Sequence, residues 1–153
     1  MVVRRGPVRA TNIRPPWHLW VVGLFFILLY GAGAYDYVMT HRHDAAYFAS
    51  QNYDAGQIAY FTDYPVVPAV FWTLAVWGGL AAAMLLLFRS RWATRVVLVA
   101  LISQVCLDVV TFAVMDRWQN LGPLLALLDG VVLLLTLGLL LYCRAMSARD
   151  VLR

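Results

Sequence analysis

Charged residues are scarce in this sequence and restricted in kind. Lys and Glu are absent, so all 12 basic residues are Arg and all 8 acidic residues are Asp, and charged residues make up only 13% of the 153-residue chain. Hydrophobic residues make up 63%, and the mean hydropathy is +0.73. A soluble domain of this length could not keep so much apolar surface away from water. The composition therefore excludes a soluble globular protein and indicates a membrane protein.

Catalytic and redox motifs are also missing. The sequence has no phosphate-binding Gly loop, no G-x-S-x-G and no H-E-x-x-H. Its two cysteines, Cys106 and Cys143, form no C-x-x-C motif, and we predict them too far apart along the membrane normal for a disulfide. We therefore predict that the chain is not an enzyme and carries no cofactor. An enzyme acting on a lipid or quinone, and a haem shared between subunits, remain as alternatives.

Four apolar runs predict an all-α membrane protein, a bundle of four transmembrane helices in a single domain spanning residues 1–153. About 20 apolar residues are needed to cross a bilayer, and the predicted helices cover about residues 17–37, 65–88, 96–115 and 121–143. Residues 1–16 form a basic tail broken by proline, and residues 38–64 form a polar, aromatic-rich loop. Four crossings use most of the chain, so no room remains for a soluble catalytic domain.

The distribution of Arg predicts the orientation in the membrane. Ten of the twelve Arg residues lie in the tail, the 89–95 turn and the C-terminus, and only Arg42 and Arg117 lie on the opposite side. Short cytoplasmic segments are enriched in basic residues, so we expect both termini in the cytoplasm and the 38–64 loop in the periplasm. This topology also explains the isoelectric point near 9.4, and we expect no nucleic acid partner.

The first apolar run has a competing interpretation as a signal peptide, because Ala32-Gly33-Ala34 precedes Tyr35 as in an A-x-A cleavage site. The long basic segment before it and the transmembrane length of the run favour a retained helix. The second run carries the small-residue pairs Gly78/Ala82 and Gly79/Ala83, which indicate a helix-packing face. The partner helix lies either in the same chain or in another subunit.

Two carboxylates are predicted inside the membrane. Asp108 and Asp129 each lie roughly 10 to 12 Å from the outer turn, at 1.5 Å per residue. Gln104, Asp108 and Thr111 follow the i, i+4, i+7 spacing of one helix face. A charge in the bilayer is costly and marks a functional candidate, so these four residues form a candidate proton or cation site. The alternative is a structural lock, in which each Asp is protonated or bonded to a neighbour such as an Arg.

The outer halves of the first two helices supply candidates for a vestibule that opens outward. These are Asp36 and Tyr35 on the first helix and Trp72 and Thr73 on the second. Asp54 and Gln57 fit a capping box, which predicts a short helix from about Ala55 to Thr62. The aromatic loop is interpreted either as a belt at the headgroups or as a lid over a cavity. His41, His43 and Asp44 could ligate a metal, but we predict a solvated turn and no metal there.

Part of the chain, about residues 12–95, resembles a widespread group of small, functionally uncharacterised four-helix proteins of the bacterial inner membrane, some of them labelled sugar transporters. The residues that carry the resemblance are Asp36-Tyr37-Val38-Met39-Thr40, Ala46-Tyr47, Gln57-Ile58-Ala59-Tyr60-Phe61, Pro65, Trp72, Val76-Trp77-Gly78 and Leu86-Leu87-Phe88-Arg89-Ser90-Arg91-Trp92-Ala93. The resemblance implies the four-helix fold and a multi-pass location in the bacterial inner membrane. It implies no mechanism.

Two functions follow as expectations. The first is a non-enzymatic membrane subunit that packs against other membrane protein subunits in a larger assembly, or forms a homo-oligomer, within the lipid bilayer. The second is a small proton- or cation-coupled transporter that uses Asp108 and Asp129. A four-helix monomer is small for alternating access, so the transporter would also need an oligomer.

Overall fold

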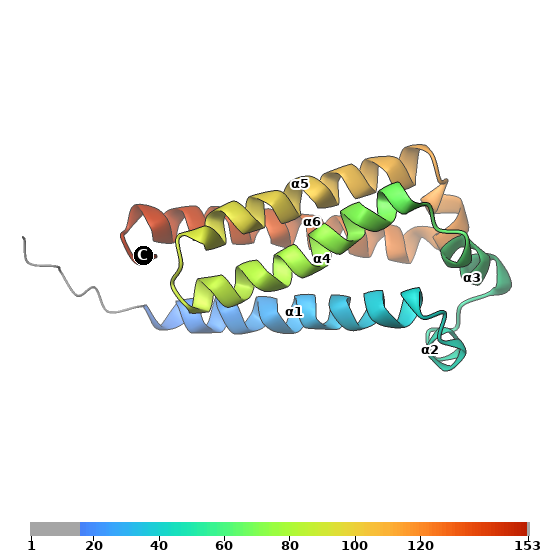
Figure 1. Ribbon diagram of the computed structural model, residues 1–153, viewed down its shortest axis with the longest axis horizontal. Coiled ribbons are helices and arrows are strands. Elements are labelled where there is room, and N and C mark those ends of the chain that lie inside the picture. Colours follow the sequence, from blue (N-terminus) through green and yellow to red (C-terminus); the bar gives the residue numbers. More distant parts are fainter. Residues whose placement is uncertain (1–15, 153) are drawn as a thin grey trace, which may run out of the picture.

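The computed structural model describes residues 16–152, all of whose regular structure is helical (Figure 1). Its elements are α1 (Trp17–His41), α2 (Ala45–Ser50), α3 (Ala55–Thr62), α4 (Val66–Leu87), α5 (Trp92–Ala113) and α6 (Arg117–Ala148). Four of them, α1, α4, α5 and α6, are long and apolar enough to cross a membrane. The chain is thus an integral, multi-pass membrane protein, as the hydropathy predicts. The predicted basic tail lies almost wholly outside the described residues.

The four long helices begin and end close to their predicted positions but run longer in three cases. Where the sequence predicts an outer loop over 38–64, α1 continues to His41 and two short helices follow. The Ala32-Gly33-Ala34 segment lies inside α1 without interruption. Helix α3 has the predicted bounds, and its capping box is present, with Asp54 and Gln57 bonded reciprocally at 2.8 and 3.0 Å. That prediction is confirmed.

The last helix differs most from the prediction, because it begins before residue 121. Asp116 takes a left-handed backbone conformation (φ 45°), and a first turn then starts at Arg117. Gly122 breaks this turn from the rest of the helix with φ 81° and ψ 170°, a region that favours glycine. Pro123 follows and has no N–H to donate to the preceding turn. Residues 116–120, between the third and fourth predicted helices, therefore include a helical turn set at an angle to the main part of α6.

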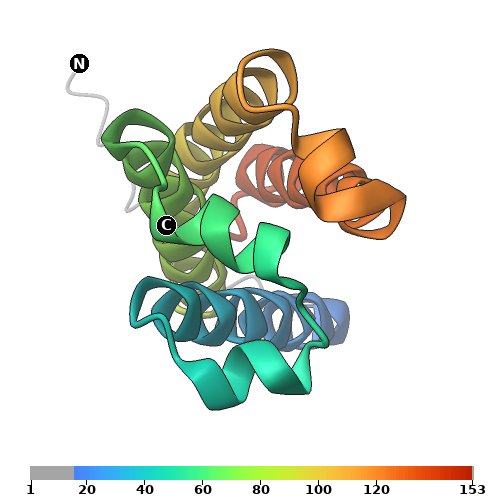
Figure 2. The same cartoon turned by 90° about the vertical axis from the view of Figure 1, so that its right-hand side faces the viewer.

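The helices pack in series, α1 on α4, α4 on α5 and α5 on α6 (Figure 2). Helices α1 and α6 lie further apart and are bridged by long side chains. Tyr30 bonds to Thr136 across this gap at 2.8 Å, and His18 bonds to Tyr142 at 2.5 Å. The bundle has two halves: the terminal half, where α1 begins and α6 ends, and the loop half, where α2 and α3 lie (Figure 1).

The small-residue face of α4 is used inside the chain. A Cβ atom on Gly79 would overlap the ring of Tyr30 from α1, and one on Gly78 would lie 3.3 Å from the Cβ of Ala100 on α5. Ala82 and Ala83 are fully buried. Small residues let helices approach closely, and here they bring α1 and α5 against α4.

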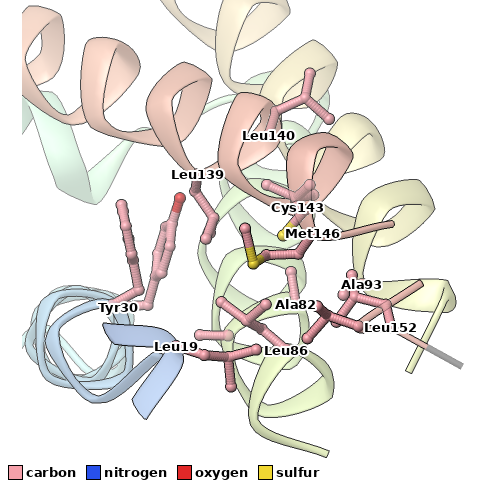
Figure 3. Close-up of a cluster of buried hydrophobic side chains, with 14 residues drawn as sticks. Leu19, Tyr30, Ala82, Leu86, Ala93, Leu139, Leu140, Cys143, Met146 and Leu152 are labelled. Carbon is pink, nitrogen blue, oxygen red and sulfur yellow. The ribbon is translucent and has the colours of Figure 1, made fainter. Parts of the chain in front are cut away.

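A hydrophobic core fills the terminal half (Figure 3). Its fully buried side chains include Leu19 of α1, Leu86 of α4 and Leu139 of α6. The segment that follows α6 folds back onto this core, where Val151 and Leu152 are buried and the Val151 carbonyl accepts a hydrogen bond from Arg89 Nε at 3.0 Å. The terminal half is therefore closely packed and apolar.

Candidate functional site

A cavity of about 150 Å³ lies between the four long helices in the loop half of the bundle. Three of its lining residues are carboxylates from three different helices: Asp36 of α1, Asp108 of α5 and Asp129 of α6. Gln104 and Trp72 also line it. One water needs only about 10–15 Å³ of such space, so the cavity has room for a small molecule or several waters.

A second cavity of about 180 Å³ adjoins the first beneath α3. The two share the lining residues Asp36, Trp72, Leu107 and Asp129. The second is also lined by Arg117 and by aromatic residues of the loop and α3 end: Tyr53, Phe61 and Tyr64. We name the first the acidic chamber and the second the aromatic chamber.

Asp129 is neutralised by an ion pair with Arg117. The guanidinium donates from Nε to Oδ2 at 2.5 Å and from Nη2 to Oδ1 at 3.0 Å, a bidentate arrangement. The pairing depends on the break at Gly122, which separates the turn that carries Arg117 from the part of α6 that carries Asp129. Both side chains are mostly buried, at 16% and 24% exposure. For Asp129, the geometry therefore fits the structural interpretation, in which the carboxylate is bonded to an Arg, better than the interpretation as a free carboxylate.

Asp108 has no such partner. It is half-buried and faces the acidic chamber, and within the described residues no hydrogen bond or ion pair joins its carboxylate to another side chain. Its neighbours in the chamber include the neutralised Asp129 and Gln104. Asp108 is therefore the carboxylate of the predicted pair that is available to a proton or another cation.

Asp36 adds a third carboxylate, and it is held in place by the loop. The Tyr47 hydroxyl donates to Asp36 Oδ1 at 2.5 Å, and Thr40 Oγ1 lies 3.5 Å from the same oxygen. Burial, and then the hydrogen bond to Asp36, raise the pKa of Tyr47 well above its usual value. Tyr47 thus stays protonated as a donor and fixes α2 against α1.

A chain of buried polar side chains forms the floor of the acidic chamber. Tyr30 bonds to Thr136 at 2.8 Å, and the Thr136 hydroxyl lies 3.0 Å from Gln104 Oε1. All three residues are buried. Beyond Tyr30 the interior becomes the hydrophobic core of the terminal half (Figure 3). The polar region of the bundle therefore ends at this floor.

Aromatic rings cover the loop end of the cavities. Trp72 contacts Phe61 at 6.1 Å and Tyr64 at 5.7 Å between ring centroids, and Tyr53 stacks on Phe61 at 5.9 Å. Helix α3 crosses the loop end of the bundle (Figure 2), where Gln57 Nε2 donates to the Leu121 carbonyl at 3.4 Å. Burial raises the pKa of Tyr64 strongly. This arrangement supports the lid interpretation of the loop.

The structure brings together five of the eight residues that the sequence singles out. Asp36, Trp72, Gln104, Asp108 and Asp129 all line the acidic chamber. Thr111, Thr73 and Tyr35 do not. The hydroxyls of Thr111 and Thr73 donate hydrogen bonds to the backbone carbonyls of Leu107 and Ala69, respectively. Tyr35 is 57% exposed.

The metal alternative at His41, His43 and Asp44 gains no support. Within the described residues, no three His, Cys or acidic side chains are close enough to hold a metal ion. His41 instead stacks on Tyr37 with ring centroids 4.1 Å apart, and it contacts Trp72.

Four residues that belong to the site in the structure are not identified from the sequence: Arg117, Tyr47, Tyr30 and Thr136. Arg117 lies in the outer turn between the third and fourth predicted helices, and its pairing with Asp129 needs the Gly122 break, for which Gly122-Pro123 is the available signal. Tyr30 and Thr136 lie in apolar runs, where a single hydroxyl leaves the pattern unchanged.

Comparison of the chain with protein-family models, with curated proteins and with solved structures finds no match.

Proposed function

We propose that this protein is a non-enzymatic, proton- or cation-coupled carrier whose binding site is the acidic chamber. One observation supports this most strongly: Asp108 faces a chamber between the long apolar helices with no bonded side-chain partner among residues 16–152, while the nearby Asp129 is neutralised by Arg117. A carboxylate kept inside a membrane protein at this cost is a functional candidate. The two carboxylates predicted from sequence thus have different proposed roles. Asp108 binds and releases the proton or cation, and Asp129 is the neighbour that Arg117 holds in position.

The distribution of polar groups supports the direction of access. The chamber adjoins the loop end through the aromatic chamber, whereas its floor rests on the apolar core. Ten of the twelve Arg residues belong to the N-terminal segment, the 89–95 turn and the C-terminal segment of the sequence, and by the positive-inside rule this distribution supports a loop half on the outer side. We propose a bacterial inner membrane location in which the cavities load from the periplasm.

An assembly with further subunits is the second part of the proposal. Four helices are few for alternating access within one chain, so we expect a homo-oligomer or a larger membrane complex. The small-residue face of α4 is one reason to expect an external partner, but in the structure this face packs against helices of the same chain. The outward face of α6, which includes Leu127, Leu134 and Leu141, is exposed and apolar. It is available to lipid or to another subunit, and native mass measurement of the mildly extracted protein would distinguish these.

The test of the carrier is proton uptake into vesicles. Purified protein is reconstituted with a pH-sensitive dye in the lumen, a lumen-negative potential is imposed, and luminal acidification is followed. The wild type should acidify the lumen faster than protein-free vesicles, and Asp108→Asn should fall to the protein-free rate because its amide cannot exchange a proton. Asp116→Asn is the matched control, since Asp116 is exposed at the same end and Asn tolerates its left-handed backbone.

Folding is checked separately by gel filtration and circular dichroism, and Asp108→Glu provides a conservative variant. Retention of proton uptake in Asp108→Glu together with its loss in a folded Asp108→Asn supports the carrier. Wild-type rates in a folded Asp108→Asn would contradict it, and so would a wild type that acidifies no faster than empty vesicles.

A further inference from the structure

The two adjoining chambers carry both negative charge and aromatic surface. Of the three carboxylates, Asp129 is balanced by Arg117, which leaves Asp36 and Asp108 facing the acidic chamber. The Tyr47 hydroxyl donates to Asp36 without changing its charge. When both are ionised the cavity is therefore net negative, which disfavours anions and attracts cations.

The geometry does not suit a bare inorganic cation. Ca²⁺ takes six to eight oxygen ligands and Mg²⁺ a near-octahedral set, whereas within the described residues no three acidic, His or Cys side chains, including the three chamber carboxylates, form a group that could hold a metal ion. The chambers of about 150 and 180 Å³ are also far larger than an ion. Space of this size fits an organic group.

Aromatic rings form part of the walls of both chambers. Trp72 lines both chambers, and Phe61, Tyr64 and Tyr53 line the aromatic chamber. The faces of Trp, Tyr and Phe attract ammonium and quaternary ammonium groups through the ring quadrupole, and such cations need no directional donors or acceptors. The shared position of Trp72 lets one ligand meet both a ring and the carboxylates.

We propose that the substrate class of the carrier is a small organic ammonium cation, held between the ring of Trp72 and the carboxylates of Asp36 and Asp108. The proposal rests on the proposed function, and it adds the identity of the ligand to it. A proton on Asp108 and the ammonium group compete for the same negative charge, so binding of one weakens binding of the other. This competition is the physical basis of coupling in the carrier.

The test compares a cation with its neutral isostere. Choline and 3,3-dimethylbutan-1-ol have the same shape but differ in charge, and their binding to the full-length protein in lipid nanodiscs is measured by titration calorimetry. Choline should bind and the alcohol should bind at least about tenfold more weakly, since the charge-dependent contacts are lost. Binding of choline should weaken as pH falls, because protons occupy Asp108.

Variants of the aromatic wall give a second readout. Trp72→Leu should weaken choline binding about 5- to 30-fold, and Trp72→Phe should weaken it less because a ring face remains. Trp118→Leu is the matched control, since Trp118 is 59% exposed at the same end of the bundle and lines neither chamber. Asp36→Asn should also weaken binding.

The outcomes separate this proposal from the proposed function. Absence of choline binding, or equal binding of choline and the alcohol, in a protein whose proton uptake still depends on Asp108 overturns the ammonium proposal alone. Equal effects of Trp72→Leu and Trp118→Leu on choline affinity overturn it as well. Proton uptake that does not depend on Asp108 overturns the proposed function itself.

Discussion

The same four helices pack differently in the two halves of the bundle. In the terminal half, Leu19, Leu86 and Leu139 are fully buried and interlock in an apolar core. In the loop half, the space between the same helices contains carboxylates, an Arg and two adjoining chambers. The boundary lies at Tyr30, whose ring packs in the core and whose hydroxyl belongs to the chamber floor.

This difference indicates where stability and function reside. Close packing stabilises a membrane bundle through dispersion contacts that a cavity forfeits. The loop half forgoes these contacts around the chambers and adds the cost of burying charged groups. A fold selected for stability alone would fill this space with apolar side chains, and this contrast is why we propose the loop half as the functional half.

The largest expected effect concerns the ion pair of the loop half. Arg117→Gln leaves the mostly buried Asp129 without a counter-charge, and we expect the free energy of unfolding to fall by about 3 kcal/mol. Adding Asp129→Asn removes the orphaned charge and should restore more than half of that loss. Unfolding by SDS in mixed micelles measures both, and Arg91→Gln, an exposed residue of the terminal half, is the control. If the double variant is no more stable than Arg117→Gln, the two residues are not coupled.

A smaller effect tests the boundary between the halves. Gly79→Ala places a Cβ on the ring of Tyr30, and we expect a loss of about 1–3 kcal/mol because the tightly packed ring must shift. Gly31→Ala is the matched control in α1, since nothing lies within 4 Å of its added Cβ. It should be neutral or stabilise by up to about 1 kcal/mol through helix propensity. Equal effects of the two substitutions in thermal unfolding would show that α1 does not seat on α4 as described.

The smallest effect is a pH dependence of the loop half. Burial raises the pKa of Tyr64, and burial together with Asp36 raises that of Tyr47. Folding thus favours the neutral phenols, and their contribution to stability is complete below the ordinary Tyr pKa of about 10 and is lost as pH rises above it. An absorbance titration should show tyrosines that ionise late, and Tyr47→Phe should remove part of this late signal. A single transition near the ordinary value for all tyrosines would contradict a packed lid.

Much of the fold is predictable because it depends on local properties of the sequence. Apolar runs of membrane-spanning length predict α1, α4, α5 and α6, and the capping residues Asp54 and Gln57 predict α3 with its bounds. Residue counting predicts that Asp108 and Asp129 lie at equal depth, and in the structure both line the acidic chamber.

The remaining features depend on the directions of side chains and of the backbone, which the spacing of residues in the sequence does not determine. Thr111 shares the helical spacing of Gln104 and Asp108, but its hydroxyl bonds to the carbonyl four residues earlier and so needs no cavity partner. The partner of Asp129 depends on the backbone break at Gly122, which sets the turn of Arg117 at an angle. Hydroxyls such as those of Tyr30 and Thr136 do not disturb the apolar pattern, so their bond across α1 and α6 is visible only in three dimensions.

The central claim, a wet cation site in the loop half and a dry core in the terminal half, is tested most directly on one face of α4. Val76 lines the acidic chamber, and Ala83, two turns further along the same helix, is fully buried in the core. Each is replaced by Cys in a Cys106→Ala background, and its reaction with the impermeant cation 2-(trimethylammonio)ethyl methanethiosulfonate is timed by mass spectrometry. We predict that Val76→Cys reacts at least about tenfold faster than Ala83→Cys, and that choline slows the reaction. Equal rates at the two positions would contradict the account.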